Sequence, residues 1–432
     1  MPRSGEAETI FALATSQGRA GVAVFRISGP KAVAAAEHLC GSVGDDRKMC
    51  RRELRDEDGG LIDDALVVTF LHGRSFTGEN VVEIHAHGSI AVSRAISKRL
   101  RALEFVRDAE PGEFTRRAFE NGRLDLTQVE GLADLIDAET EAQRRQAMSV
   151  YEGGLKRELA AIKTSLLRAS ALCAASIDFA DEEVPDDLVN EIAATVETAS
   201  NTIGNLVAGH VGARRIVDGI EVAIIGAPNA GKSTLMNAMT GEEVAIVTDQ
   251  AGTTRDVLEC RLDMGGQLVR LLDTAGLRET DDIIEKEGVR RARARAAAAD
   301  IRMFLYEGAA EKHDLQQSGD IVVLTKADIN ARAGAISAKT GAGMNRLMEE
   351  LRVRVQDLTP KGSFVASERQ AVLLGSAREA CGAALTALQQ ELGPEVVSQE
   401  IGQGLRAIEE VVGRVGVEDV LGEVFSSFCI GK

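Results

Sequence analysis

The sequence predicts a multidomain α/β and α protein, with an N-terminal α+β domain, a helical domain and a further α/β domain inserted into the helical one. Three observations support this fold class. β-like runs occur through residues 1–120, apolar residues recur at every third or fourth position over much of 121–217 and 363–432, and a strand–loop–helix signal opens residues 218–362. With 432 residues the chain is also too long for one hydrophobic core.

Residues 1–120 mix short strands with helices. The segments Val22–Ser28, Ala65–Leu71 and Val81–His87 are rich in branched residues and are bounded by glycine, proline or acidic clusters, which is typical of strands. The runs KAVAAAEHL and VSRAISKRLRAL between them predict helices. We expect a small α+β domain.

The two helical regions, 121–217 and 363–432, are expected to pack together. Each contains apolar stripes at helical spacing that would face water if the region folded alone. Residues 218–362 would then form an inserted domain, which is tolerated because the ends of a domain usually lie close together. The main stripes are Leu155, Leu159, Ile162, Leu166, Ala169, Cys173 and Ile177, then Leu188, Ile192, Val196, Ala199, Ile203 and Val207, and later Leu373, Ala377, Cys381, Ala384 and Leu388.

Composition limits the surroundings and the partners. The chain has 50 basic and 67 acidic residues, a net charge of −17, so RNA would be repelled unless a local basic patch or a basic partner binds it. Its six cysteines show no metal-ligand or disulfide spacing, which fits a reducing cytosol. No apolar run is long enough to span a membrane and no signal pattern opens the chain, so we expect a cytoplasmic protein without a membrane partner.

The segment GAPNAGKS at Gly226–Ser233 predicts a phosphate-binding loop. It follows a buried strand and precedes a helix, the context in which loop amides and the positive helix end hold phosphates. Lys232 is expected to reach the β- and γ-phosphates and Ser233 to bind Mg²⁺.

Three later motifs identify the nucleotide. They are GTTRD at 252–256, DTAG at 273–276 and TKAD at 325–328, and they indicate a Ras-like P-loop GTPase domain with a mostly parallel sheet and flanking helices. Thr254 would complete the Mg²⁺ shell and Asp273 would support it. Lys326 and Asp328 would hold the base, since a carboxylate accepts guanine N1–H and N2–H₂, a donor pair that adenine lacks. The segment SAK at 337–339 fits the last base-binding loop.

The position after DTAG departs from Ras. Leu277 stands there, and an apolar side chain cannot orient a water molecule as the glutamine of Ras does. Another group must therefore act, and no arginine finger can be assigned from the sequence.

Taken together, PNAGKS, TDQAGTTRD, DTAGLRE and the terminal FCIGK resemble the MnmE (TrmE) family of tRNA-modification GTPases. The resemblance covers nearly the whole chain and includes FRISG, SFTGE, PGEFTRRAF, LDLTQVEGLADLIDA and DFADEE. It implies a homodimer that works with an FAD-containing partner, MnmG. The two would install a carboxymethylaminomethyl-type group at carbon 5 of the wobble uridine of certain tRNAs. A tetrahydrofolate would supply the one-carbon unit, and tRNA would be held largely through the partner.

The resemblance also implies roles for particular residues. The GTPase would be stimulated by K⁺, whose charge can replace that of the missing arginine. Glu285 would position the attacking water through a second water, although a solvated acid at a helix start would look the same in sequence. The K⁺ ligands would be Asn229, Thr248, Gln250 and Thr253. The expected GTP-binding residues are Asn229, Ala230, Gly231, Lys232, Ser233, Thr234, Thr248, Thr253, Thr254, Asp273, Thr274, Ala275, Gly276, Thr325, Lys326, Asp328, Ser337, Ala338 and Lys339, with Ser233 and Thr254 on Mg²⁺.

For the folate, the resemblance carries over Arg26, Glu79, Arg123 and Lys432. A guanidinium can pair with a folate carboxylate, but without the resemblance each would be read as a surface charge. Cys429 lies three residues from Lys432, and its thiol is a catalytic candidate if its pKa is lowered. A buried, inert cysteine is equally compatible with the sequence.

Two departures from the family bear on the nucleotide site. Thr325 stands where asparagine is usual, so we expect the loss of an amide that braces the phosphate loop. The stretches on either side of Thr325 are also short, which predicts a trimmed peripheral helix and weaker nucleotide binding.

We therefore expect an enzyme, a K⁺-stimulated GTPase that drives tRNA modification. The alternative is a ribosome-assembly-type switch in which the GTP state only gates RNA docking. A structural dimeriser with a degenerate GTPase domain is a third possibility, and the intact Lys232, Ser233 and Asp328 argue against it. The folate-like segments and FCIGK distinguish the first from the second, because an assembly switch needs neither.

Overall fold

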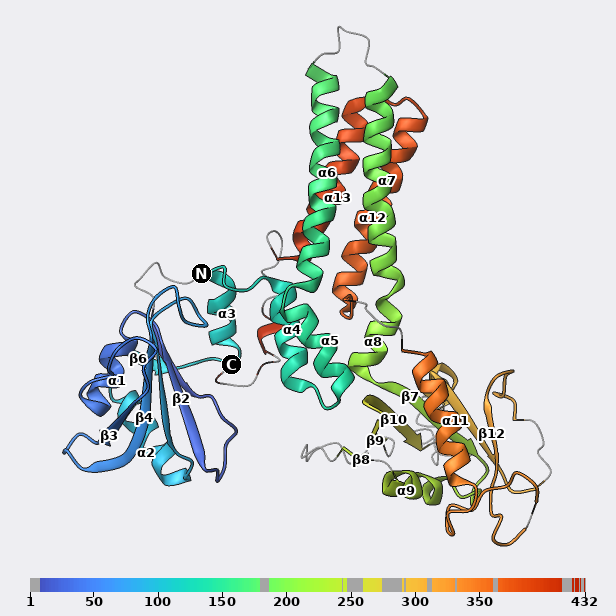
Figure 1. Ribbon diagram of the computed structural model, residues 1–432, viewed down its shortest axis with the longest axis horizontal. Coiled ribbons are helices and arrows are strands. Elements are labelled where there is room, and N and C mark those ends of the chain that lie inside the picture. The colour runs from blue at the N-terminus through green and yellow to red at the C-terminus, as the bar shows by residue number, and fades with distance from the viewer. Residues whose placement is uncertain are drawn as a thin grey trace. The chain divides into compact units, whose positions relative to one another are not determined.

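The computed structural model describes residues 8–178, 186–242, 244–246, 259–273, 290, 293–308, 313–330, 332–359, 364–413, 422, 424–426, 428 and 431 (Figure 1). The chain forms two compact units. The first consists of Met1–Ala133 and Val412–Lys432, and the second of Asp134–Val411.

The first unit is built on a sheet with the strand order β3-β4-β5-β2-β1-β6. Strand β6 is parallel to β1, and the other neighbours are antiparallel. One face carries the apolar core, where Phe11, Phe25 and Ile84 pack with buried residues of α1 and α2. The elements are β1 (Thr9–Leu13), β2 (Val22–Ser28), α1 (Ala32–Cys40), β3 (Cys50–Arg55), β4 (Leu61–Phe70), β5 (Val81–His87), α2 (Ile90–Arg101), β6 (Val106–Asp108), α3 (Glu113–Glu120) and α4 (Leu126–Asp137).

The expected α+β character of this unit is confirmed, but the sequence did not predict strands β1, β3 and β6. Strand β3 reads CRRELR, and of its residues only Leu54 is fully buried. Charged, outward-facing residues are usual on the edge of a sheet, where they discourage pairing with other chains. Because β4 pairs with β3, it begins at Leu61, earlier than the predicted Ala65.

The C-terminal segment packs on the first unit. Phe425 and Phe428 form a small core with Val129, and the Phe119 and Phe425 rings lie 6.5 Å apart. Gly431 has a φ of 101°, and a Cβ there would lie 2.3 Å from the carbonyl oxygen of Leu13. Only glycine therefore fits at this position as the chain passes the end of β1.

In the second unit, four long helices form a bundle (Figure 1). The pairs α6–α7, α7–α12, α12–α13 and α13–α6 are in contact, and Lys163 of α6 forms an ion pair with Glu409 of α13. Most residues of the predicted stripes, among them Leu166, Val196 and Ala377, are fully buried. The helices of this part are α5 (Glu141–Tyr151), α6 (Gly154–Asp178), α7 (Asp186–Ala208), α8 (His210–Asp218), α12 (Glu368–Gln389) and α13 (Pro394–Val411).

Two of these helices, α6 over Gly154–Ile177 and α12 over Glu368–Gln389, are long and apolar enough in composition to cross a membrane. This is weak evidence, because core helices of soluble proteins have the same composition. In this structure both helices belong to the bundle and bury one side against its other members.

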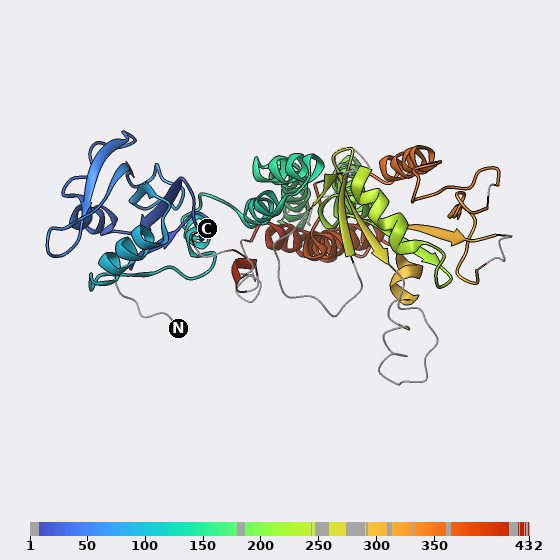
Figure 2. The same ribbon diagram turned by 90° about the horizontal axis from the view of Figure 1, so that it is seen from below.

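The chain between α8 and α12 forms a second sheet, in the order β12-β11-β7-β10-β9-β8. Strands β10, β7, β11 and β12 are parallel, and β9 is antiparallel to its neighbours, which confirms the expected mostly parallel sheet. Figure 2 shows α9 lying across these strands. The elements are β7 (Ile220–Gly226), α9 (Lys232–Glu242), β8 (Val244–Ala245), β9 (Glu259–Met264), β10 (Gln267–Asp273), β11 (Ile301–Tyr306), β12 (Ile321–Leu324) and α11 (Met344–Asp357).

Candidate nucleotide and folate sites

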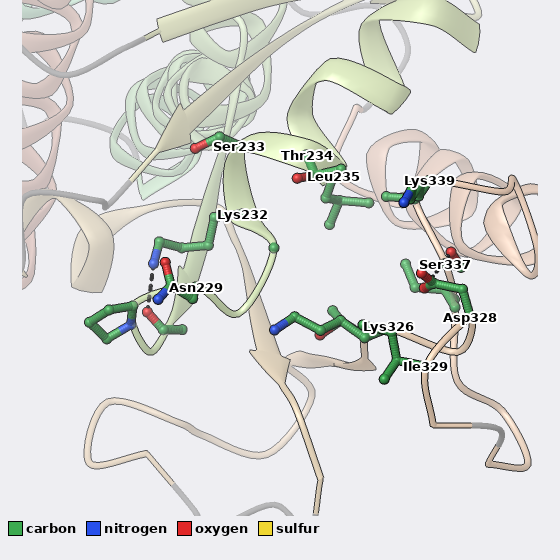
Figure 3. Close-up of a pocket in the computed structure, with 16 residues that line it drawn as sticks. Asn229, Lys232, Ser233, Thr234, Leu235, Lys326, Asp328, Ile329, Ser337 and Lys339 are labelled. Atoms are coloured by element: carbon green, nitrogen blue, oxygen red, sulfur yellow. Dashed lines mark hydrogen bonds between the residues drawn. The ribbon is translucent and has the colours of Figure 1, made fainter.

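A cavity of about 500 Å³ opens at the carboxyl ends of the parallel strands of the second sheet. The loop between β7 and α9 lines one part of it, and the loops after β12 line the other (Figure 3). Its size is in the usual range for a small-molecule site. Of the predicted GTP-binding residues, it brings together Asn229, Gly231, Lys232, Ser233, Thr234, Thr325, Lys326, Asp328, Ser337, Ala338 and Lys339.

The phosphate loop is shaped by its own backbone and by Lys232. Asn229 has a φ of 63°, in the left-handed region, and Ala230 is buried beneath the loop. The Lys232 ammonium group donates to the carbonyl oxygens of Gly226 and Ala227 at 2.8 and 3.0 Å (Figure 3). A buried cation and loop amides beside the start of α9 suit a phosphate group.

Ser233 and Asp273 meet at one edge of this loop. The hydroxyl of Ser233 donates to Oδ2 of Asp273 at 3.0 Å, and Asp273 is buried at the end of β10. A hydroxyl and a carboxylate are oxygen ligands of the kind that Mg²⁺ prefers, so this pair fits the predicted metal position. Asp273 is brought there by the β9–β10 hairpin, which turns at Gly265 and Gly266 with φ values of 64° and 88°.

The base-binding side is held by a hydrogen bond between its two loops. The buried hydroxyl of Ser337 donates to Oδ1 of Asp328 at 2.8 Å. This hydrogen bond, followed by one from the backbone, lowers the pKa of Asp328. The group is therefore ionised at neutral pH, as an acceptor for two guanine donors must be. The N–H of Ala327 donates to the carbonyl of Ile336 at 3.0 Å, which closes the two loops on each other.

Thr325 contacts the phosphate loop, although a threonine at this position led us to expect that this contact was lost. Its hydroxyl donates to the carbonyl oxygen of Ala230 in the phosphate loop at 2.8 Å, and lies 3.3 Å from that of Tyr306. The expected loss of the phosphate-loop brace was therefore wrong, because the threonine hydroxyl reaches the loop in place of an amide.

Several predicted residues lie outside the part of the chain that the structure describes. Most of the predicted K⁺ ligands, one Mg²⁺ ligand, both catalytic candidates and one folate residue are among them, so their roles stay predictions. These residues are Thr248, Gln250, Thr253, Thr254, Thr274, Ala275, Gly276, Glu285, Cys429 and Lys432.

In the first unit, the three described folate candidates lie around the turn at residues 73–79. The Arg26 guanidinium is 5.7 Å from the Phe76 ring centre and forms an ion pair with Glu83 at 2.9 Å. Glu79 ends the turn. The side chain of the exposed Arg123 lies beside Gly78, and its Nη1 donates to the carbonyl of Gly73 at 3.3 Å.

Sequence reasoning gave no role to the residues that hold Glu79. Its Oε2 accepts a hydrogen bond from Ser28 at 2.7 Å and pairs with Arg117 at 3.0 Å. Arg117 also pairs with Glu113 at 2.9 Å, and Glu113 pairs in turn with Arg107 at 2.7 Å. Glu113 and Arg117 belong to the PGEFTRRAF segment, whose match to the family was the available signal. Ser28, Arg117 and Glu113 are largely buried, so they hold the Glu79 carboxylate in one orientation.

The described cysteines are all free. Burial raises the pKa of Cys40 and of Cys381 to about 11, so both remain thiols at neutral pH and neither suits nucleophilic chemistry.

Comparison with known proteins gave consistent results along the whole chain. Residues 9–123 match the family model for the N-terminus of the GTP-binding protein TrmE, and residues 126–429 match that for the MnmE helical domain. Proteins named tRNA modification GTPase MnmE from Roseobacter denitrificans and Ruegeria pomeroyi are 49% and 48% identical, over 98% of this chain and 100% of theirs.

The chain also resembles parts of solved structures. The G domain of the T. maritima FeoB iron transporter is 23% identical, covers 33% of this chain and 99% of its own length, and has a TM-score of 0.23. A GTP-binding protein from Sulfolobus solfataricus in complex with GDP is 14% identical, covers 62% of this chain and 78% of its own, and has a TM-score of 0.25. Scores this low support no conclusion about the chain.

Proposed function

The chain belongs to the MnmE family of tRNA modification GTPases, and on this basis we propose that it hydrolyses GTP to drive modification at carbon 5 of the wobble uridine of certain tRNAs. The product would carry a carboxymethylaminomethyl-type group, and an FAD-containing MnmG-type protein would be the partner. The observation that supports this best is the cavity in which a phosphate loop and an Asp328-containing base loop line the same space.

Different described residues would bind the base, the phosphates and the Mg²⁺ ion of GTP. Asp328, kept ionised and oriented by Ser337, accepts the guanine N1–H and N2–H₂. Lys232 and the loop amides take the phosphates, and Ser233, with Asp273 beside it, would hold Mg²⁺. When bound, this ion neutralises charge on the β- and γ-phosphates.

Hydrolysis is proposed to depend on K⁺ as well. Asn229 is the proposed K⁺ ligand that the structure describes, and it lines the cavity within the phosphate loop. Thr248, Gln250 and Thr253 would complete the set, and Glu285 would position the attacking water. A second cation beside the phosphates would supply the kind of charge that an arginine finger supplies in other GTPases.

We propose that the turn at 73–79 binds a tetrahydrofolate. Among the described residues, the Arg123 guanidinium makes one long hydrogen bond, to Gly73, and its other N–H groups would donate to a folate carboxylate. The Glu79 carboxylate offers oriented acceptors for ring N–H groups. The Arg26 guanidinium already pairs with Glu83 through Nε and Nη2, so its contribution would be charge and ring contact more than a new bidentate pair. Lys432 would complete the folate site, and Cys429 is proposed as a catalytic thiol.

The protein is proposed to be a cytoplasmic homodimer that meets tRNA largely through its partner. A net charge of −17 favours this division, because a polyanion is attracted more strongly to a basic partner. The proposed domains are 1–120, 121–217, 218–362 and 363–432.

The enzymatic part of the proposal is tested by measuring GTP hydrolysis in KCl and in NaCl at equal ionic strength. We expect hydrolysis well above background in KCl and a large loss in NaCl, and Glu285→Ala should bind GTP but turn it over slowly. Hydrolysis at background in both salts would favour a structural dimeriser. Hydrolysis in both without any effect on tRNA modification would favour the ribosome-assembly-type switch.

A further inference from the structure

Glu307 is an acidic residue directly after β11, and its carboxylate forms an ion pair with the ammonium group of Lys326. Lys326 lines the nucleotide cavity, whereas Glu307 is not among the residues that line it. The lysine stem therefore runs along the cavity wall, and its charged end is held at the edge. Figure 3 shows the Lys326 side chain extending between the phosphate-loop residues and Asp328.

Lys326 has an unusual backbone conformation that its surroundings must maintain. Its φ is 61°, in the left-handed region that residues with a Cβ rarely adopt. Its carbonyl accepts hydrogen bonds from the N–H groups of Ile329 and Asn330 at 3.0 and 2.9 Å, which fixes the backbone. The ion pair with Glu307 fixes the other end of the same side chain. Strained residues that are held in this way are commonly functional.

On the basis of the proposed function, we propose that Glu307 is a positioning residue for the base site. It holds the Lys326 stem as a preformed apolar wall against the face of the purine ring. A free lysine side chain loses considerable conformational entropy when it is ordered, and the ion pair removes part of that loss before the nucleotide arrives. Glu307 therefore raises affinity without touching the nucleotide.

This role differs from that of Asp328 in a measurable way. Asp328 reads the N1–H and N2–H₂ groups of guanine, so its contribution depends on the 2-amino group. The lysine stem meets the ring face, which guanine and hypoxanthine share. Loss of Glu307 should therefore lower the affinities for GDP and IDP by the same factor and leave the preference between the two nucleotides unchanged.

The experiment is a double-mutant cycle on the full chain, with Kd values for GDP and IDP from titration calorimetry. Glu307→Gln is expected to lower the affinity for both nucleotides roughly three- to tenfold. This is the effect expected when a partly exposed ion pair orders a side chain that contacts the ligand. In a Lys326→Met background, Glu307→Gln should have almost no further effect. The exposed Glu349 of α11 supplies a matched control, since Glu349→Gln removes one surface carboxylate away from the cavity and should bind as wild type.

Any of these binding results would overturn the inference: wild-type affinity in Glu307→Gln, an equal loss in the Lys326→Met background, or a loss confined to one nucleotide. In each case wild-type protein would still bind GDP and the proposed function would stand. Failure of the wild-type protein to bind GDP would overturn both. Thermal unfolding without nucleotide should be the same for Glu307→Gln and wild type, and a fall in the midpoint would assign Glu307 to structure instead.

Discussion

Thr325 lies in the base-binding segment and connects it, through two hydrogen bonds, to the end of β11 and to the phosphate loop. Its N–H donates to the carbonyl of Tyr306 at 2.9 Å, and its hydroxyl donates to Ala230 of the phosphate loop at 2.8 Å. A hydroxyl has one proton, so the shorter contact, to Ala230, is the better one. Base binding and phosphate binding are thereby mechanically connected at a single side chain.

Thr325→Val should speed GDP release on the order of tenfold. Valine has nearly the same shape but no donor, so the buried Ala230 carbonyl loses its partner at a cost of about 1–2 kcal/mol. Stopped-flow release of a fluorescent GDP measures this effect. Thr325→Ser, which keeps the hydroxyl, should release GDP at nearly the wild-type rate. Equal rates for valine and wild type would show that the hydroxyl does not brace the loop.

Asp328→Asn should change the base preference from guanine towards xanthine nucleotides. An amide offers one acceptor and one donor group in place of two acceptors, which matches the carbonyl at position 2 of xanthine. The affinities of the variant for GTP and XTP measure this preference directly. An unchanged GTP affinity would refute the assignment of Asp328 to the base.

Helix α3 and its preceding turn place a charged cluster beneath the proposed folate site. Burial alone would raise the pKa of Glu113, but hydrogen bonds from Arg107, from the N–H of Glu110 and from Arg117 outweigh it and hold the pKa below the usual value. A carboxylate with a lowered folded pKa stabilises the fold fully above its unfolded pKa, and this contribution disappears as the pH falls through the folded pKa.

The first unit should therefore lose stability on acidification below about pH 4.5, the ordinary pKa of glutamate. Hydrogen exchange of peptides from β1, β2 and α3, followed from pH 6 to pH 3, tests this. Glu113→Gln should reduce the acid-dependent part of the change. If hydrogen exchange in Glu113→Gln depended on pH as it does in wild type, the loss of stability in acid would come from groups other than Glu113.

The end of the chain passes β1 at a distance that only a glycine at position 431 allows. A Cβ there would lie 2.3 Å from the Leu13 carbonyl, so Gly431→Ala should displace the segment that carries Phe425 and Phe428 and weaken folate binding. Titration calorimetry with a reduced folate would show the loss of folate affinity. Gly422→Ala is the control, because a Cβ at Gly422 has nothing within 4 Å. Equal folate affinity in both variants would mean that this close approach is not needed for binding.

The helices and the phosphate loop could be predicted because their signals are local. The spacing of Leu155, Leu159 and Ile162 in α6 is visible in the sequence, as is the strand–loop–helix order around Lys232. The partners of the site residues could not be predicted in this way. Glu79 and Arg117 are 38 residues apart, and Lys326 and Glu307 are 19 apart, so each contact depends on how strands and turns are arranged in space.

Across the whole molecule, the first unit is discontinuous in sequence. Residues 412–432 return to it after the entire second unit, so the proposed folate site and the C-terminal motif are parts of one compact unit. The nucleotide cavity belongs to the second unit. The predicted domain boundaries stay a prediction, since they divide helical segments more finely than these two units do.

The central claim, that this chain drives wobble-uridine modification, is tested most directly by nucleoside mass spectrometry of bulk tRNA from a deletion strain. The strain would be complemented with wild-type protein, Cys429→Ser or an empty vector. We predict that the modified uridine is absent with the empty vector and returns with wild type, while the Cys429→Ser sample shows whether that thiol takes part in the chemistry. Full modification with the empty vector would contradict the claim and leave the assembly switch as the better account.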